Sequence, residues 1–259
     1  MSFKYNRVLL VGATSGIGAS MAEKFIREGA KVIAVGRRQE RLDAFVQKHG
    51  PDKASGVRYD ITDSAGLDAF VDGIVSKYPD LDCVFLNAGT QTPILLSKPA
   101  EVDLDAFHRE ISTNFSRPMD LSIKFLPHLL AKPFPTALLF TGSLLAAVPV
   151  IKAPAYATSK AALTAYVSCL RQVHKGSNTK IIEIWPPLVQ SEIHDYMGPE
   201  KGRKMGMPTD EFTEQAWAQL AAGSEMVIVG SLGPPKEFHE MLRLRNGIFD
   251  TMANGRWGP

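Results

Sequence analysis

The sequence has few cysteines, no long apolar run and almost balanced charge. Its two cysteines, Cys83 and Cys169, fall in segments patterned like buried elements, so we expect reduced core thiols rather than a disulfide framework. No apolar stretch approaches the ~20 residues that a membrane-spanning helix needs. The formal net charge of +2 is too small to indicate binding to nucleic acid or to an acidic membrane surface. With no signal-peptide pattern at the N-terminus, we expect a cytoplasmic protein.

Two further absences narrow the chemistry. The histidines, among them His128, His174, His194 and His239, stand apart from cysteines and acids at ligand spacing, so we expect no metal site. No serine lies in a GxSxG motif, which argues against an α/β-hydrolase.

Short apolar runs alternate with helix-like segments, a pattern typical of a parallel sheet with helices on both faces. The expected strands are 8–11, 31–35, one ending with 57–60, 83–86, 137–140, 180–185 and 226–229. No linker or repeat interrupts the pattern, which predicts one domain over residues 1–259. The irregular segment around 190–210 contains three methionines, and we interpret it as a substrate lid.

A glycine-rich turn follows the first expected strand and precedes a helix. It reads Gly12-Ala13-Thr14-Ser15-Gly16-Ile17-Gly18. In this context glycines let backbone N–H groups approach a pyrophosphate, and the helix N-terminus favours its negative charge. The alternative is that these glycines serve only a tight turn.

The end of the second strand bears on the choice of cofactor. An acid about 20 residues after the glycines would bind the ribose hydroxyls of NAD. Here Gly36 is followed by Arg37 and Arg38, and guanidinium groups pair well with a phosphate. These residues favour NADP, unless the two arginines are merely the solvated start of a helix.

Polar or small residues also follow three later strands, at the edge where open α/β sheets bind ligands. Asp60-Ile61 could contact a ligand or cap a helix, and Asn87-Ala88-Gly89 could permit close approach or form a plain turn. Ser143 is equally consistent with a turn residue and with a hydroxyl directed at a substrate. Asn114 lies near the end of a helix that begins at about residue 104, where an amide is mildly unfavourable.

Tyr156 and Lys160 are four positions apart in an expected helix of residues 155–173, so they share one face. A fixed ammonium beside a phenol lowers its pKa, which would make Tyr156 usable as a proton donor or acceptor. By itself this spacing is weak, since most such pairs are surface pairs.

Taken together, these motifs resemble the short-chain dehydrogenase/reductase family over nearly the whole chain. The resemblance implies a doubly wound, Rossmann-type sheet of about seven mostly parallel strands. It also implies NADP(H) contacts at Asp60 and Ile61 (adenine), Asn87 to Gly89 (adenosine ribose), Tyr156 and Lys160 (nicotinamide ribose), Val189 and Ser191 (carboxamide), and Arg37 (phosphate). Pro187 departs from the family pattern, in which glycine is common at this position, so the nicotinamide loop could differ.

The resemblance further implies a catalytic set of Asn114, Ser143, Tyr156 and Lys160. Ser143 would bind the substrate oxygen, Tyr156 would donate the proton, Lys160 would lower the tyrosine pKa, and Asn114 would hold a relay water. We expect an NADPH-dependent reductase of a small to medium apolar carbonyl compound, forming a homodimer or homotetramer. The alternatives are an NAD-dependent alcohol dehydrogenase and a cofactor-binding protein without redox activity.

Overall fold

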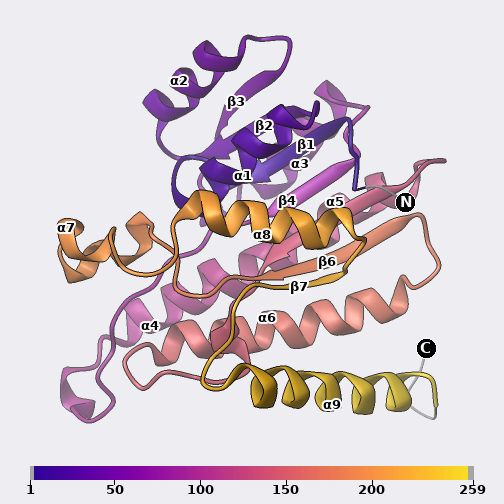
Figure 1. Ribbon diagram of the computed structural model, residues 1–259. Coiled ribbons are helices and arrows are strands. Elements are labelled where there is room, and N and C mark those ends of the chain that lie inside the picture. The colour runs from indigo at the N-terminus through magenta and orange to yellow at the C-terminus, as the bar shows by residue number, and fades with distance from the viewer. Residues whose placement is uncertain (1–2, 256–259) are drawn as a thin grey trace.

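The computed structural model of the protein describes residues 3–255. The outermost positions of the expected domain, 1–2 and 256–259, lie outside the described residues. Within the described range the chain forms one sheet flanked by helices (Figure 1), which confirms the predicted fold class.

The sheet contains seven strands in the order β3-β2-β1-β4-β5-β6-β7, and every pairing in the described chain is parallel. The strands are β1 (Arg7–Val11), β2 (Lys31–Gly36), β3 (Ala54–Arg58), β4 (Cys83–Leu86), β5 (Thr136–Thr141), β6 (Thr179–Trp185) and β7 (Met226–Ile228). The central strands are continuous apolar runs because helices cover both faces of the sheet.

The helices of the described chain divide between the two faces. They are α1 (Gly16–Arg27), α2 (Gln39–His49), α3 (Leu67–Lys77), α4 (Leu104–Ile111), α5 (Arg117–Leu130), α6 (Pro154–Val173), α7 (Pro199–Gly202), α8 (Thr209–Ala221) and α9 (Pro235–Ala253). One core cluster joins the sheet to α1 and α8 through Phe25 and Phe212, and the other joins it to α5 and α6 through Phe125 and Leu163.

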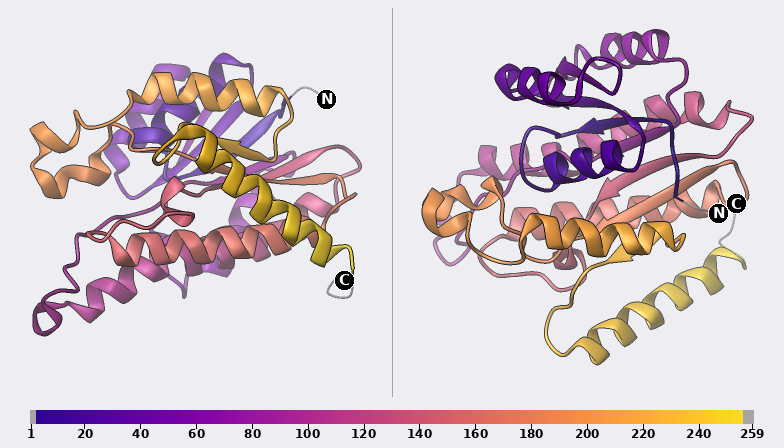
Figure 2. Two further views of the ribbon diagram at one scale, coloured as in Figure 1. Left: turned by 60° about the horizontal axis from the view of Figure 1, so that its bottom comes forward. Right: turned by 45° about the horizontal axis from the view of Figure 1, so that its top comes forward.

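The helix α9 is the exception and belongs to neither layer. It packs at the margin of the molecule against the end of β6 and the turn after β5, where Phe238 and Leu242 contact Trp185 and Leu144 (Figure 2). It is longer than the segment 236–245 expected from the sequence, because its second half keeps helical backbone while exposing apolar side chains.

Strand order reverses between β2 and β4, which both pair with β1. Open α/β sheets bind ligands in the crevice that such a reversal opens at the carboxyl ends of the strands. The sequence motifs therefore meet at this edge.

Three local expectations need correction. Cys83 is buried, but Cys169 is exposed on the outer side of α6, so only one of the two thiols is a core residue. Asp60 does not cap a helix: its carboxylate accepts from the N–H of Thr62 in a turn, and α3 begins only at Leu67. Asn114 lies in a π-helical turn (Ser112–Ser116) between α4 and α5, where a continuous helix changes pitch.

None of the helices within residues 3–255 combines the length and apolar character needed to cross a bilayer.

Candidate active site

A cleft of about 1430 Å³ runs along the carboxyl edge of the sheet. Small-molecule sites commonly occupy about 300–1000 Å³, so this cleft has room for a cofactor and a substrate together. Nearly all the expected site residues line it: Gly12, Thr14, Ser15, Gly16, Ile17, Arg37, Arg38, Asp60, Ile61, Asn87, Ala88, Gly89, Ser143, Tyr156, Lys160, Val189 and Ser191.

Two expected site residues, Gly18 and Asn114, do not line the cleft but support its wall. A Cβ at Gly18 would lie 2.0 Å from the carbonyl oxygen of Gly12, so glycine there lets α1 pack tightly against the turn. Asn114 is fully buried behind the wall. Neither Gly18 nor the Asn114 side chain therefore reaches the surface of the cleft.

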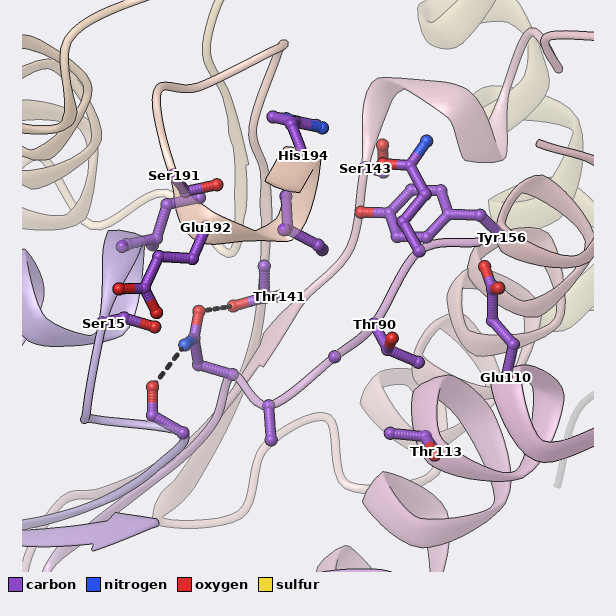
Figure 3. A pocket seen from close by; sticks show the side chains of 18 of the residues that line it. Ser15, Thr90, Glu110, Thr113, Thr141, Ser143, Tyr156, Ser191, Glu192 and His194 are labelled. Carbon is purple, nitrogen blue, oxygen red and sulfur yellow. Dashed lines mark hydrogen bonds between the residues drawn. The ribbon is translucent and has the colours of Figure 1, made fainter. Parts of the chain in front are cut away.

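The side chain of Asn87 ties three strand ends together at the centre of the cleft (Figure 3). Its amide nitrogen donates to the Gly12 carbonyl at 3.0 Å, and its oxygen accepts from the Thr141 hydroxyl at 2.9 Å. Because Gly12 follows β1, Asn87 follows β4 and Thr141 ends β5, one amide fixes the spacing of the edge. The small-residue motif at 87–89 is therefore more than a plain turn.

The glycine turn needs glycine for backbone reasons. Gly12 has φ of 89°, in the left-handed region, and a Cβ there would lie 2.6 Å from the backbone nitrogen of Ala88. The turn leads directly into α1, whose N-terminal N–H groups favour an anion. Ser15 precedes the helix without capping it, and its hydroxyl instead accepts a hydrogen bond from Arg38.

Tyr156 lies in the first turn of α6 and is 8 % exposed. Burial raises the pKa of its phenol to about 12; a hydrogen bond with Ser143 opposes this rise, and the charge of Glu110 adds to it. The sequence-based expectation that Lys160 holds the tyrosine pKa below its usual value is therefore wrong. Desolvation of the phenolate outweighs the neighbouring ammonium.

Lys160 is buried one turn further along α6. Its Nζ donates to the Thr141 carbonyl at 2.6 Å and lies 5.6 Å from the centre of the Tyr156 ring. Burial lowers the pKa of Lys160 to about 8, opposed by the carboxylates of Glu183 and Glu110. The spacing of four residues does bring the two side chains together, and with a pKa of about 8 the lysine is still mostly charged at neutral pH.

Asn114 uses its amide to hold neighbouring segments. Its oxygen accepts from the Thr90 N–H at 2.8 Å, and its nitrogen donates to the Thr90 carbonyl at 2.8 Å and to the Ser159 hydroxyl at 3.2 Å. It thereby joins the loop after β4 to the catalytic helix α6. Its place in a π turn fits the frequent occurrence of such turns at functional sites.

Ser143 follows β5 and begins a 3-10 turn, Leu144–Ala146. Its hydroxyl accepts from the Leu145 N–H at 3.1 Å and forms a hydrogen bond with Tyr156. Figure 3 shows Ser143 beside Tyr156, with Glu110 and Thr90 on the far side of the phenol.

The two arginines after β2 differ in their surroundings. The Arg37 side chain is 74 % exposed and approaches only Asp60, at 3.8 Å. Arg38 points into a polar network, where it donates to Thr14 Oγ1 at 2.8 Å and to Ser15 Oγ at 2.7 Å. Arg38 is therefore bound to the glycine turn, and Arg37 stands at the rim.

Three charged residues at the site escaped the sequence analysis. Arg41 lies one helical turn after Arg38 and donates to the Thr14 carbonyl at 2.9 Å. Glu192 accepts from both arginines. Glu110 is 1 % exposed; its Oε2 accepts from the Thr92 N–H, and its Oε1 has no partner among the described residues. Arg41 and Glu110 could have been found from the sequence, because they lie one helical turn from the predicted site residues Arg38 and Asn114, respectively. Glu192 has no such spacing from a predicted helical site residue.

No group of three potential metal ligands occurs in the described part of the chain. His194 is buried at the cleft: burial lowers its pKa, and its Nδ1 lacks a partner among residues 3–255.

Comparison with known proteins agrees with this geometry. The family model described as short chain dehydrogenase matches residues 6–202. The chain is 29 % identical to the uncharacterized oxidoreductase DltE of Bacillus subtilis (strain 168) over 228 residues, which is 88 % of this chain and 89 % of that protein. It is 31 % identical to a serine 3-dehydrogenase of Rhizobium radiobacter over 187 residues, or 72 % and 73 % of the two chains.

Among solved structures, a short-chain dehydrogenase from Sphingobium yanoikuyae in complex with NADPH has the same fold. Its TM-score is 0.81 at 22 % identity, and the match covers 96 % of each chain. Other structures of this fold hold NADP or NAD, so the fold alone does not select between the two cofactors.

Proposed function

The chain belongs to the short-chain dehydrogenase/reductase family, and we propose that it is an NADPH-dependent reductase converting a carbonyl group of a small to medium apolar substrate to an alcohol. The observation that carries this proposal is a single cleft with a buried phenol and ammonium at one end and an arginine-lined glycine turn at the other. Such a cleft suits a long, anionic dinucleotide whose reactive end must lie in a dry environment.

The residues present fit the cofactor. The glycine turn and the N-terminus of α1 would hold the pyrophosphate, Asp60 and Ile61 the adenine, and Asn87 to Gly89 the adenosine ribose. Tyr156 and Lys160 would hold the nicotinamide ribose, and Val189 and Ser191 the carboxamide. Arg38 would hold the 2′-phosphate, with the exposed Arg37 as a weaker contributor at the rim of the cleft. The bound cofactor supplies the hydride.

Tyr156 is the proton donor in this proposal. A carbonyl oxygen between Ser143 and Tyr156 gains negative charge as its carbon is reduced, and the Ser143 hydroxyl donates a hydrogen bond to it. The pKa of about 12 keeps the phenol protonated at neutral pH, so Tyr156 is ready to give its proton to the developing alkoxide. Because an alkoxide is a stronger base than a phenolate, the transfer runs toward the substrate.

Lys160 and Asn114 have supporting roles. Lys160 places its positive charge within reach of the phenolate left by proton transfer and stabilises it. Asn114 fixes the Thr90 loop against α6, and we retain for it the additional role of holding a water that resupplies the proton. Proton resupply then follows Lys160 toward solvent.

The proposal of an apolar substrate rests on the far end of the cleft. Its lining includes Leu145, Val150, Ile193, Tyr196 and Met197. Ile193 to Met197 belong to the segment around 190–210, which we propose as a lid over the substrate. Methionine adapts to irregular apolar shapes, which suits such a role.

The test is a screen of ketones and aldehydes for consumption of NADPH, measured at its absorbance band, with NADH run in parallel. We expect apolar carbonyl compounds to be reduced faster with NADPH. Turnover only of alcohols with NAD would favour the alternative dehydrogenase. Tight NADPH binding without turnover of any carbonyl or alcohol would favour a non-redox binding protein.

Assembly and location are also proposals. Exposed apolar residues on α9, among them Met241, Leu244, Ile248 and Met252, support a homodimer or homotetramer. Light scattering at micromolar protein would measure the mass, and a monomer would contradict it. Two free cysteines support a reducing, cytoplasmic location, which fractionation of cells would test.

A further inference from the structure

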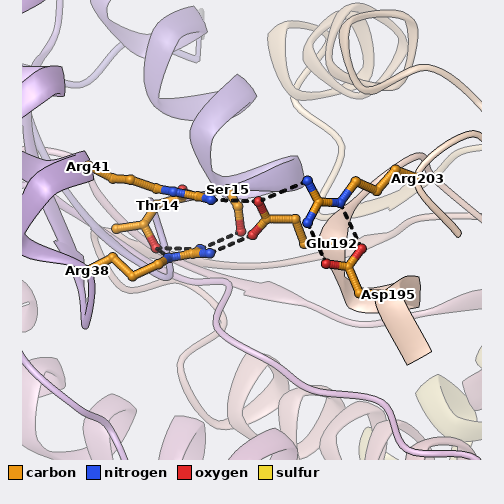
Figure 4. A network of polar contacts seen from close by, with 7 residues as sticks. All are labelled: Thr14, Ser15, Arg38, Arg41, Glu192, Asp195 and Arg203. Atoms are coloured by element: carbon orange, nitrogen blue, oxygen red, sulfur yellow. Dashed lines mark hydrogen bonds and ion pairs between the residues drawn. The ribbon is translucent and has the colours of Figure 1, made fainter. Parts of the chain in front are cut away.

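The carboxylate of Glu192 lies between two arginines at the nucleotide end of the cleft (Figure 4). Its Oε2 accepts from Arg38 Nη1 at 2.5 Å, and its Oε1 lies 2.8 Å from Arg41 Nη2. Arg203 approaches the same carboxylate at 4.0 Å. One acidic group thus neutralises the positive charge that the sequence motif brings to this position.

The same arginines are bound to the glycine turn. Arg38 donates to the hydroxyls of Thr14 and Ser15, and Arg41 donates to the Thr14 carbonyl. A 2′-phosphate bound by these two arginines would need the hydrogen bonds that the Glu192 carboxylate accepts. A carboxylate and a phosphate are both anionic acceptors that guanidinium groups bind through paired hydrogen bonds, so they compete for the same partners.

Glu192 reaches this position from another part of the fold. It is the first residue of a 3-10 helix, Glu192–Met197, that follows Ser191 in the proposed lid. The lid has a second ion pair, Asp195 with Arg203 at 2.6 Å, which touches neither Arg38 nor Arg41. The Glu192 side chain is 22 % exposed, so it can leave the arginines without unpacking the core.

The charge of Glu192 is present at all ordinary pH values. Hydrogen bonds from Arg41 and Arg38 hold the pKa of its carboxyl at about 2. A competitor for the arginines therefore has to be an anion of comparable strength, which a 2′-phosphate is and a ribose hydroxyl is not.

We propose that Glu192 occupies the 2′-phosphate subsite, competes with the phosphate for Arg38 and Arg41, and is displaced by the phosphorylated cofactor. This inference rests on the proposed use of NADPH. A cofactor with the 2′-phosphate replaces the carboxylate on Arg38 and Arg41 and releases the start of the lid. A cofactor without it leaves the Glu192 contacts in place and gains nothing from the arginines.

The consequence is that Glu192 lowers both the affinity for 2′-phosphorylated ligands and the preference for them over ligands without that phosphate. Glu192 weakens the binding of every 2′-phosphorylated ligand, because its own hydrogen bonds must break first. Replacing it with glutamine keeps the shape but removes the charge. We expect phosphorylated ligands to bind about tenfold tighter to E192Q, since one charge-assisted hydrogen bond is of that order.

The experiment measures calorimetric binding of adenosine 2′,5′-bisphosphate and of AMP, which lacks the 2′-phosphate. The proteins are the unaltered chain, Glu192→Gln, Glu192→Ala and the control Asp195→Asn, at about 0.15 M salt to screen distant charges. Asp195→Asn removes one negative charge from the same segment without touching Arg38 or Arg41. In both Glu192 variants, we expect the affinity ratio of bisphosphate to AMP to rise about tenfold over that of the unaltered chain, and in Asp195→Asn to stay unchanged.

Two results would overturn the inference. One is an unchanged ratio in both Glu192 variants, and the other is an equal rise in Asp195→Asn. If the unaltered chain still prefers the bisphosphate in either case, the proposed NADP site stands and only the role of Glu192 fails. If no protein in the set prefers the bisphosphate, the phosphate subsite and the role of Glu192 fail together.

Discussion

The two ends of the cleft treat charge in opposite ways. At the nucleotide end, the charged groups are partly exposed and pair directly: Arg38 and Arg41 hold the carboxyl pKa of Glu192 at about 2. At the catalytic end, Tyr156 and Lys160 are buried, and desolvation moves both toward their neutral forms. Pairing therefore favours the charged forms at one end, while burial disfavours them at the other, where Lys160 is still mostly charged at neutral pH.

This difference separates binding from chemistry. Paired, half-exposed charges exchange partners easily, which suits a subsite that must admit and release an anion. A buried phenol kept protonated at neutral pH suits a group that must donate a proton only when negative charge develops beside it. Substitutions at the two ends should accordingly change different quantities.

The largest expected effect is at the catalytic end. Tyr156→Phe removes the proton donor while keeping the ring, so we expect kcat to fall about 10²–10⁴-fold, the usual contribution of general acid catalysis. The dissociation constant for NADPH should change little. Stopped-flow reduction and fluorescence titration of the same preparation would measure the two quantities, and full activity in the variant would remove Tyr156 from the mechanism.

A second pair of substitutions probes the nucleotide end. Arg38→Ala should weaken NADPH binding roughly 10–100-fold, because it removes charge-assisted hydrogen bonds to the phosphate. Arg37→Ala serves as the matched variant and should cost less than about fivefold, as for other exposed charges. Titration with NADPH would compare them, and equal losses would assign the phosphate to both arginines.

The burial of Lys160 predicts a pH dependence of stability. Its pKa is about 8 in the folded protein, below its ordinary value of 10.5. Between these values the unfolded chain binds a proton that the folded protein does not, so the free energy of unfolding rises with pH in this window.

Lys160→Met removes that titration. From pH 7.5 to 9.5, the free energy of unfolding of the unaltered protein should therefore rise by about 2 kcal/mol more than that of the variant. Urea denaturation at the two pH values would measure this difference. Parallel changes in both proteins would mean that Lys160 keeps its ordinary pKa.

The ion pairs of Glu192 at the nucleotide end predict a smaller effect of pH on stability, which appears at acidic rather than alkaline pH. Its pKa is about 2 in the folded protein against an ordinary 4.5, so its contribution to stability is full above pH 4.5 and is lost as pH falls toward 2. Between pH 6 and pH 3, the unaltered protein should lose about 1 kcal/mol more stability than Glu192→Gln, after allowance for solvent screening. Denaturation at both pH values tests this, and identical losses would show that the arginine contacts add no stability.

Much of the fold could be predicted from the sequence, because strands buried on both faces of a parallel sheet consist of consecutive apolar residues. All seven strands occur close to their expected positions, and the strand-end motifs meet at one edge. The spacing of Tyr156 and Lys160 correctly predicted their proximity, since helix geometry fixes it.

What the sequence could not predict depends on contacts between distant segments. The tyrosine pKa depends on how completely α6 is buried, which overrides the local effect of Lys160. Glu192 lies far along the chain from Arg38 and Arg41, and only the fold brings them together. The exposure of Cys169 could not be predicted either, because a helix that packs against the core on one side still has an exposed side, and the sequence did not show on which side Cys169 lies.

The central claim is that the arginine end selects a phosphorylated cofactor for the buried Tyr156. Its most direct test is the ratio of the dissociation constants of NADPH and NADH for the unaltered protein, at neutral pH and about 0.15 M salt. The account predicts that NADPH binds at least about tenfold tighter, the value of one charge-assisted hydrogen bond. Equal binding, or tighter binding of NADH, would contradict it.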